Sequence, residues 1–174
     1  MTARYIAPAR WLHWITALTI AGLFVAGIWI RFFNPEDPLS HRLYNLHEST
    51  GVALFAVILV RLMVRWRNPP PPLPVGLPAP IRLVAGATHF LLYALLLLQV
   101  ATGFVGNAAN GITLIWYEIL PIPSPIGPDK ALAMLMSDLH RASAIGLMFL
   151  IGGHLIGTLY HQFIRRDGLL RRML

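Results

Sequence analysis

The sequence predicts an all-α fold, an integral membrane four-helix bundle formed by a single domain over residues 1–174. Hydrophobic residues make up 56% of the chain and charged residues 12%, whereas a soluble domain usually carries about 25% charged residues. Four apolar stretches are each close to the roughly 20 residues that a helix needs to cross a bilayer. Proline-containing or polar segments separate these stretches. A surface that faces lipid explains this composition more simply than one that faces water.

The four apolar stretches predict membrane spans, and each has basic or polar residues at its edges. The first run is longer than the core of a signal peptide, and no small-residue cleavage site follows it. We therefore expect it to remain as a membrane span. The predicted spans are residues 9–33, 43–66, 82–106 and 131–164.

The connectors between the spans differ in character. Residues 34–41 form a short polar link that includes His41. Residues 68–80 are rich in proline, which predicts an extended, semi-rigid segment. The connector 107–130 contains an apolar, aromatic piece, Ile112 to Leu120, that is too short to span a membrane. For this piece we expect a short helix that lies at the membrane interface.

The distribution of basic residues predicts the orientation. With four spans, both termini and the second connector lie on one side, which carries ten basic residues against four on the other. Because basic residues are retained in the cytoplasm, both termini should be cytoplasmic. The basic residues border apolar runs and do not form a patch with interleaved aromatics, so membrane lipid is the expected partner and nucleic acid is not.

The residues able to hold a redox cofactor are histidines. The chain has no cysteine, which excludes disulfides, a covalently attached c-type haem, iron–sulfur clusters and thiol chemistry. It has seven histidines, most of them inside or at the edges of the predicted spans. Ionisable groups in membrane helices are costly and mark functional sites by default. Ligation of haem iron by two histidines is an obvious use for them.

Histidine spacing in the fourth span indicates two haems. His140 and His154 are fourteen residues apart, so they lie within about 40° of one helix face and about 21 Å apart along the axis. This separation suits two b-type haems stacked through one bilayer, whose core is about 30 Å thick. His13 and His47 lie at the cytoplasmic and outer ends of their spans. The predicted pairs are His13 with His154, and His47 with His140. By depth alone, His161 would suit His13 better.

Other residues near these histidines permit more than one interpretation. His89 and His161 lie at cytoplasmic span ends, where a histidine is often simply solvated. Gly51 and Gly157 each lie one turn from a predicted ligand, and they serve either helix packing or room for a porphyrin. Arg61 either extends to the cytoplasmic interface or pairs with a haem propionate. The sequence leaves these alternatives open.

Several stretches together resemble a known family, the bacterial cytochrome b561 proteins, which are related to the cytochrome b subunits of nickel–iron hydrogenases. The order and spacing of the histidines within these stretches carry the resemblance. The stretches are RWLHWITAL around His13, LYNLHESTGVALFAVILVRLMVRWRNPPPP around His47, THFLLYALLLLQVATGF around His89, and DLHRASAIGLMFLIGGHLIGTLYHQF around His140, His154 and His161.

The resemblance implies a cytochrome of the bacterial inner membrane with two haems b between its helices. It implies that the axial ligands are His13, His47, His140 and His154, and that electrons pass to ubiquinone. It further implies superoxide as the periplasmic reactant, in a superoxide:ubiquinone oxidoreductase. His89 and His161, on the cytoplasmic side, are then candidates to bind a quinone carbonyl and deliver a proton. No residue is assigned to catalysis of the superoxide step.

Two other functions remain open at this point. The first is a non-enzymatic shuttle subunit that carries electrons between quinone and a periplasmic redox partner. The outer side carries four basic and six acidic residues, which is a poor field for collecting an anion such as superoxide. The second is a haem-free transporter or metal carrier. It needs a polar pathway, and the spans offer few carboxylates beyond Glu48 and Asp138.

Overall fold

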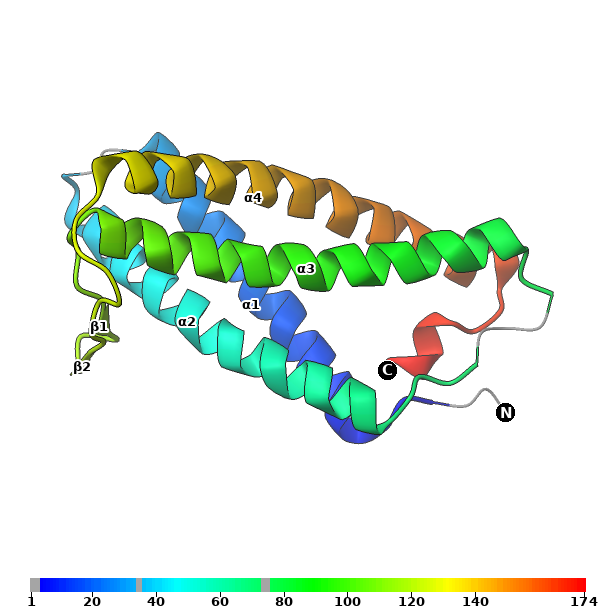
Figure 1. Cartoon of the computed structure of the whole chain (residues 1–174). Helices are drawn as coiled ribbons and strands as arrows, with labels where there is room; N and C mark the ends of the chain where they lie inside the picture. Colours follow the sequence, from blue (N-terminus) through cyan, green and yellow to red (C-terminus); the bar gives the residue numbers. More distant parts are fainter. Residues whose placement is uncertain (1–3, 34–35, 73–75) are drawn as a thin grey trace.

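The computed structural model describes residues 4–33, 36–72 and 76–174, and four long helices dominate it (Figure 1). All four are long and apolar enough to cross a membrane. The four-helix membrane fold expected from the sequence is therefore confirmed. The helices are α1 (Ala7–Phe32), α2 (Pro38–Arg67), α3 (Ala79–Ala109) and α4 (Lys130–Leu159).

The helices begin at caps that hydropathy does not reveal. The Asp37 carboxylate accepts a hydrogen bond from the backbone N–H of Leu39 at 2.9 Å, and Pro38 occupies the first turn of α2. An acidic cap followed by proline is a strong helix start. Helix α2 therefore begins five residues before the predicted span at 43. Our placement of His41 in a loop was wrong, because His41 lies in the first turns of α2.

The connector between α3 and α4 contains a hairpin where the sequence predicted an interfacial helix. Strands β1 (Ile115–Trp116) and β2 (Leu120–Pro121) pair in antiparallel fashion. Tyr117 and Glu118 join them with φ angles of 48° and 61°, as a tight two-residue hairpin turn requires. The helix prediction was wrong because prolines follow the piece closely and its polar backbone finds partners on α2. The hairpin lies at the end of the bundle opposite the chain termini (Figure 1).

Beyond α4 the chain turns back toward the bundle. Residues Tyr160–Arg165 form a π-helix, η1. Arg166 and Gly168 then adopt left-handed φ angles of 54° and 74°, and a 3₁₀ turn, η2, covers Leu170–Arg172. We call residues 166–174 the tail. The tail and the N-terminal segment lie at the same end of the bundle (Figure 1), which we call the inner end, and the hairpin end is the outer end.

A small apolar layer lies halfway along the bundle. Its buried members are Leu54 and Ile58 of α2, Leu96 of α3 and Leu147 of α4. Leu147 is seven residues from both His140 and His154. The layer therefore separates one histidine level from the other.

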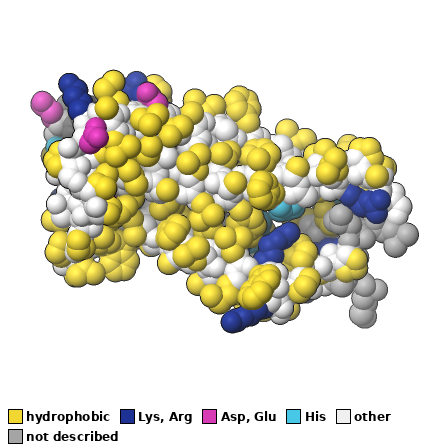
Figure 2. Space-filling model, viewed as in Figure 1, with side chains coloured by type: hydrophobic (Ala, Val, Ile, Leu, Met, Phe, Trp, Pro, Cys, Tyr) yellow, Lys and Arg dark blue, Asp and Glu magenta, His cyan; other side chains and the backbone are white. Residues whose placement is uncertain are grey.

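The outer surface of the helices is apolar. Large side chains such as Leu18, Phe149 and Trp66 are 72%, 74% and 81% exposed. Figure 2 shows hydrophobic side chains covering the middle of the bundle, with charged side chains toward its ends. Such a continuous apolar surface cannot face water in a stable monomer. The protein is a multi-pass membrane protein.

Candidate functional site

The outer histidine pair joins α2 to α4. The ring centroids of His47 and His140 are 6.3 Å apart, and their planes are 67° from parallel. Nδ1 of His140 lies 3.0 Å from the carbonyl oxygen of Gln99, to which it can donate. A histidine whose Nδ1–H is held by a carbonyl presents a lone pair on Nε2, the usual arrangement of a metal-ligating histidine. The Gln99 side-chain nitrogen lies 2.9 Å from that Nε2, so the lone pair already accepts a hydrogen bond.

Two glycines bring neighbouring backbones against the outer histidines. A Cβ at Gly27 of α1 would lie 3.3 Å from Cε1 of His47, and one at Gly103 of α3 would lie 3.1 Å from Cε1 of His140. Contacts this short leave no room for a side chain. By contrast, a Cβ at Gly51 or Gly157 would meet open space. The sequence singled out these last two glycines and missed the two that contact histidine rings from other helices.

The inner histidine cluster contains three rings. His13 of α1 and His154 of α4 have ring centroids 6.3 Å apart, with planes 62° from parallel. His89 of α3 is closer still, 5.3 Å from His154. Nδ1 of His89 can donate to the Ala85 carbonyl at 2.7 Å, which leaves its Nε2 free to accept. The structure therefore brings His89 beside a predicted haem ligand, while the sequence located it only at the cytoplasmic end of its span.

Arg61 points into this inner cluster. One of its guanidinium nitrogens lies 2.8 Å from Nδ1 of His13, and the guanidinium lies over the Tyr93 ring, 5.3 Å from its centroid. A cation over an aromatic face is stabilised by the ring quadrupole. Of the two interpretations left open for Arg61, the structure therefore excludes extension to the interface.

His161 lies apart from the three-ring cluster, in η1. It is only 8% exposed, and its Nδ1 lies 2.6 Å from Oδ2 of Asp167 in the tail. Burial raises the pKa of Asp167, but the hydrogen bonds from His161, from the Leu169 backbone N–H and from Arg165 outweigh it and hold this pKa below its usual value. Asp167 is therefore ionised at neutral pH. Sequence reasoning missed Asp167, because no local pattern predicts that the chain reverses at Arg166.

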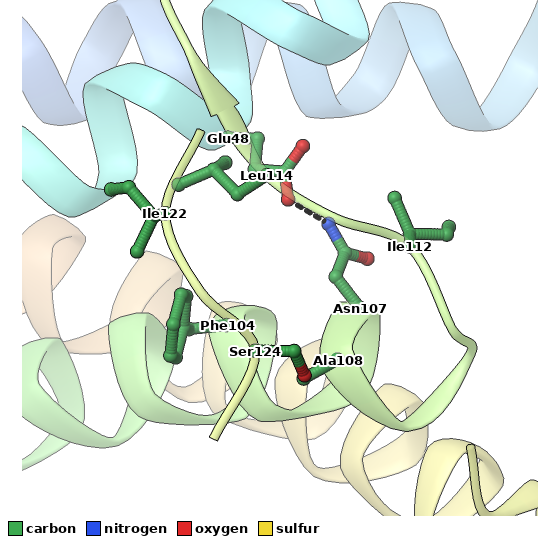
Figure 3. Close-up of a pocket in the computed structure, with 8 residues that line it drawn as sticks. All are labelled: Glu48, Phe104, Asn107, Ala108, Ile112, Leu114, Ile122 and Ser124. Carbon is green, nitrogen blue, oxygen red and sulfur yellow. Dashed lines mark hydrogen bonds between the residues drawn. The ribbon is translucent and has the colours of Figure 1, made fainter. Parts of the chain in front are cut away.

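A polar network lies at the outer end, beside His47. The Asn107 amide donates to the Glu48 carboxylate at 2.5 Å and accepts from the Tyr44 hydroxyl at 2.8 Å. Figure 3 shows Glu48 and Asn107 facing each other under the connector that carries Leu114. A cavity of about 350 Å³ opens next to this network, and both Glu48 and Glu118 line it. The outer approach to the histidines is therefore acidic.

The two pairs fit a metal ion held between two imidazoles. Two metal–nitrogen bonds of about 2 Å each, with each nitrogen about 1 Å from its own ring centre, separate the ring centroids by about 6 Å. Both pairs measure 6.3 Å. Among the described residues, no group of three or more histidine, cysteine or acidic residues is arranged to hold a bare metal ion. Two protein ligands per level match haem iron, whose other ligands come from the porphyrin.

Four membrane helices that carry stacked histidine pairs define the class of membrane-bound b-type cytochromes. Comparison with known proteins identifies the family within this class. The chain belongs to the prokaryotic cytochrome b561 family, whose model matches residues 4–174. The family resemblance predicted from the sequence is therefore confirmed. Members of this family bind b-type haem and transfer electrons in membranes.

Three relatives match along nearly the whole chain. Cytochrome b561 homolog 2 of Escherichia coli K12 is 31% identical over 98% of this chain and 91% of its own. Cytochrome b561 homolog 1 of the same organism is 27% identical over 98% of this chain and 97% of its own. A protein of Yersinia pestis named probable superoxide oxidase CybB is 25% identical over 100% of this chain and 97% of its own.

Proposed function

We propose that this protein carries electrons across the bacterial inner membrane through two haems b, from superoxide at the outer end to ubiquinone at the inner end. The proposed activity is that of a superoxide:ubiquinone oxidoreductase, with both termini in the cytoplasm. The observation that carries the proposal is the repeat of one geometry, a 6.3 Å histidine pair, at two levels of the same bundle. Those levels are about 21 Å apart along α4.

The haems would each be held by one histidine pair. His47 and His140 would hold the outer haem, and His13 and His154 the inner one. Bound haem supplies a reversible one-electron couple at each level. Ligation through Nε2 requires the proton of His13 on Nδ1, where Arg61 now donates. The guanidinium would then have to leave this nitrogen and would be free to pair with a haem propionate.

The quinone site would lie at the inner end, where histidines outnumber the proposed haem ligands. His89 and His161 are the candidates, since each can hold a quinone carbonyl and pass a proton to it. Figure 2 shows a histidine within a hollow of the inner half, close to a basic side chain and open to the lipid-facing surface. A lipid-soluble quinone could enter from that surface.

Superoxide is proposed as the outer reactant because of the Yersinia pestis relative, whose name carries that activity. The test is pulse radiolysis of the purified protein in detergent, followed by addition of a short-chain ubiquinone. We expect superoxide to reduce the haems, and quinone to reoxidise them. If superoxide leaves the haem spectrum unchanged while dithionite reduces it, superoxide is not the donor.

A second candidate function is a shuttle subunit that exchanges electrons between quinone and a redox partner protein. The acidic outer cavity favours it, because Glu48 and Glu118 repel an anion and attract a basic partner surface. Crosslinking and purification from the native membrane distinguishes the two. A stoichiometric redox partner together with no superoxide reactivity would favour the shuttle.

A further inference from the structure

His161 and Asp167 form a buried pair that haem binding does not require. Nδ1 of His161 and Oδ2 of Asp167 are 2.6 Å apart, and their side chains are 10% and 13% exposed. The Arg165 side chain reaches the same carboxylate oxygen at 3.3 Å, and the backbone N–H of Leu169 donates to the other oxygen at 3.2 Å. Every acceptor atom of the carboxylate is thus engaged, and its direction is set.

The local backbone is irregular in the way that this contact needs. After the regular hydrogen bonding of α4 ends, η1 widens the last turn around His161. Arg166 then adopts a left-handed conformation with φ of 54°, which a residue other than glycine adopts at some cost. Single-turn π-helices are frequent at functional sites. Together these two features return Asp167 to the ring six residues earlier.

The tail is held by separate contacts that do not involve the pair. The Arg172 guanidinium donates to the Pro72 carbonyl at 2.6 Å, and the Arg172 carbonyl accepts from the Tyr5 backbone N–H at 3.1 Å. The Trp14 indole donates to the Met173 carbonyl at 2.9 Å. The tail is therefore anchored to α1 and to the proline-rich connector even without Asp167, so the pair is not needed merely to tie the tail down.

We propose that Asp167 is a positioning residue for quinone chemistry, one that holds His161 with Nδ1–H on the carboxylate and Nε2 available to a quinone carbonyl. The carboxylate also stabilises the protonated imidazole that gives its Nε2 proton to the quinone oxygen. A carboxylate bonded to the far nitrogen of a working histidine fixes its tautomer and orientation in this way.

This inference rests on the proposed quinone site and adds the source of protons to it. Reduction of one quinone to quinol consumes two electrons, delivered from the outer donor through the haems, and two protons. His161 transfers a proton from Nε2 to a quinone oxygen, and a proton from cytoplasmic water replaces it. The charged side chains that act on Asp167 are His161 and Arg165. Arg165 and the Leu169 N–H keep the carboxylate ionised and oriented during this exchange.

The test measures reoxidation of the dithionite-reduced protein by a short-chain ubiquinone in stopped flow, between pH 5.5 and 8.5. For Asp167→Asn we expect an unchanged haem spectrum and a reoxidation rate about 10–100-fold lower. Because asparagine carries no charge, the pH at which the rate falls to half should move down by about one unit. Asp167→Glu restores the charge and should recover most of the rate.

Two matched controls separate positioning from packing and from net charge. Arg172→Met removes the guanidinium bond that anchors the tail but leaves the pair intact. Asp138→Asn removes a carboxylate at the outer end, where it pairs with Arg141. Both should keep the rate and the pH profile of the parent. A slow, pH-shifted Arg172→Met protein would overturn the proposal, because tail packing would then explain the effect.

The failures of the two ideas are distinguishable. If His161→Ala slows reoxidation but Asp167→Asn does not, the quinone site stands and the role of Asp167 is wrong. If both His161→Ala and His89→Ala reoxidise at the parent rate, the quinone site itself is wrong, and the role of Asp167 falls with it.

Discussion

The outer and inner histidine levels have the same pair geometry and very different surroundings. At both levels the ring centroids lie 6.3 Å apart. The outer pair is enclosed by glycine backbones, a glutamine and an acidic polar network under the hairpin. The inner pair has a third histidine, a buried arginine and a nearby histidine–aspartate pair.

This difference indicates a division of labour. Both levels can bind the same cofactor, but only the inner one is surrounded by groups that can hold or release protons. Quinone reduction needs protons, whereas oxidation of a one-electron donor such as superoxide does not. The account therefore assigns proton-coupled chemistry to the inner end and simple electron entry to the outer end.

The largest expected effect comes from removing one ligand at one level. His140→Ala should abolish the outer haem and leave the inner one, since the levels are separated by the Leu147 layer. His154→Ala should do the reverse. Haem per chain and the α-band of the remaining haem measure the outcome. A variant that loses both haems while still folding would contradict independent levels.

A smaller effect is expected from filling the space beside His140. In Gly103→Ala the new methyl would lie 3.1 Å from the ring, so the ring must shift. We expect outer haem retention on dilution to weaken about tenfold, equivalent to about 1.4 kcal/mol. Gly152→Ala is the control, because a Cβ there meets nothing within 4 Å. Equal haem loss in both variants would show that helix packing, not the ring, is responsible.

A charge change at the inner level should move only the inner haem potential. Arg61→Met removes a cation that contacts His13, and a nearby cation favours the reduced, more negative haem. The inner potential should therefore fall, by up to about 60 mV, which corresponds to a tenfold change for one electron. Potentiometric titration resolves the two haems. Arg42→Met is the control at the outer end, and a fall in the outer potential with Arg61→Met would contradict the assignment of levels.

The smallest expected effect concerns the approach of an anion. In Glu48→Gln the outer cavity loses one negative charge, so superoxide should reduce the haems about two- to threefold faster at low salt. The difference should vanish near 1 M salt, where the screening length is about 3 Å. A rate gain that persists at high salt would mean that the substitution acts on the haem rather than on the approaching anion.

The sequence predicted the bundle, the four membrane helices and the family, because each rests on a pattern within one helix. Fourteen-residue spacing on α4 was enough to expect two levels. Contacts between distant segments were not predictable in the same way. Gly103 faces His140 only because α3 and α4 pack closely, and Asp167 reaches His161 only because Arg166 reverses the chain. The hairpin at 115–121 was missed because an apolar, aromatic piece suits either an interfacial helix or two short strands.

The most direct test of the central claim is a haem count on the purified protein. Reduced-minus-oxidised spectra with quantification of extracted haem and of protein give haem b per chain. The account predicts two haems b per chain with distinguishable potentials, one for each histidine pair. A single haem per chain would contradict the two-level arrangement, and none would contradict the cytochrome function itself.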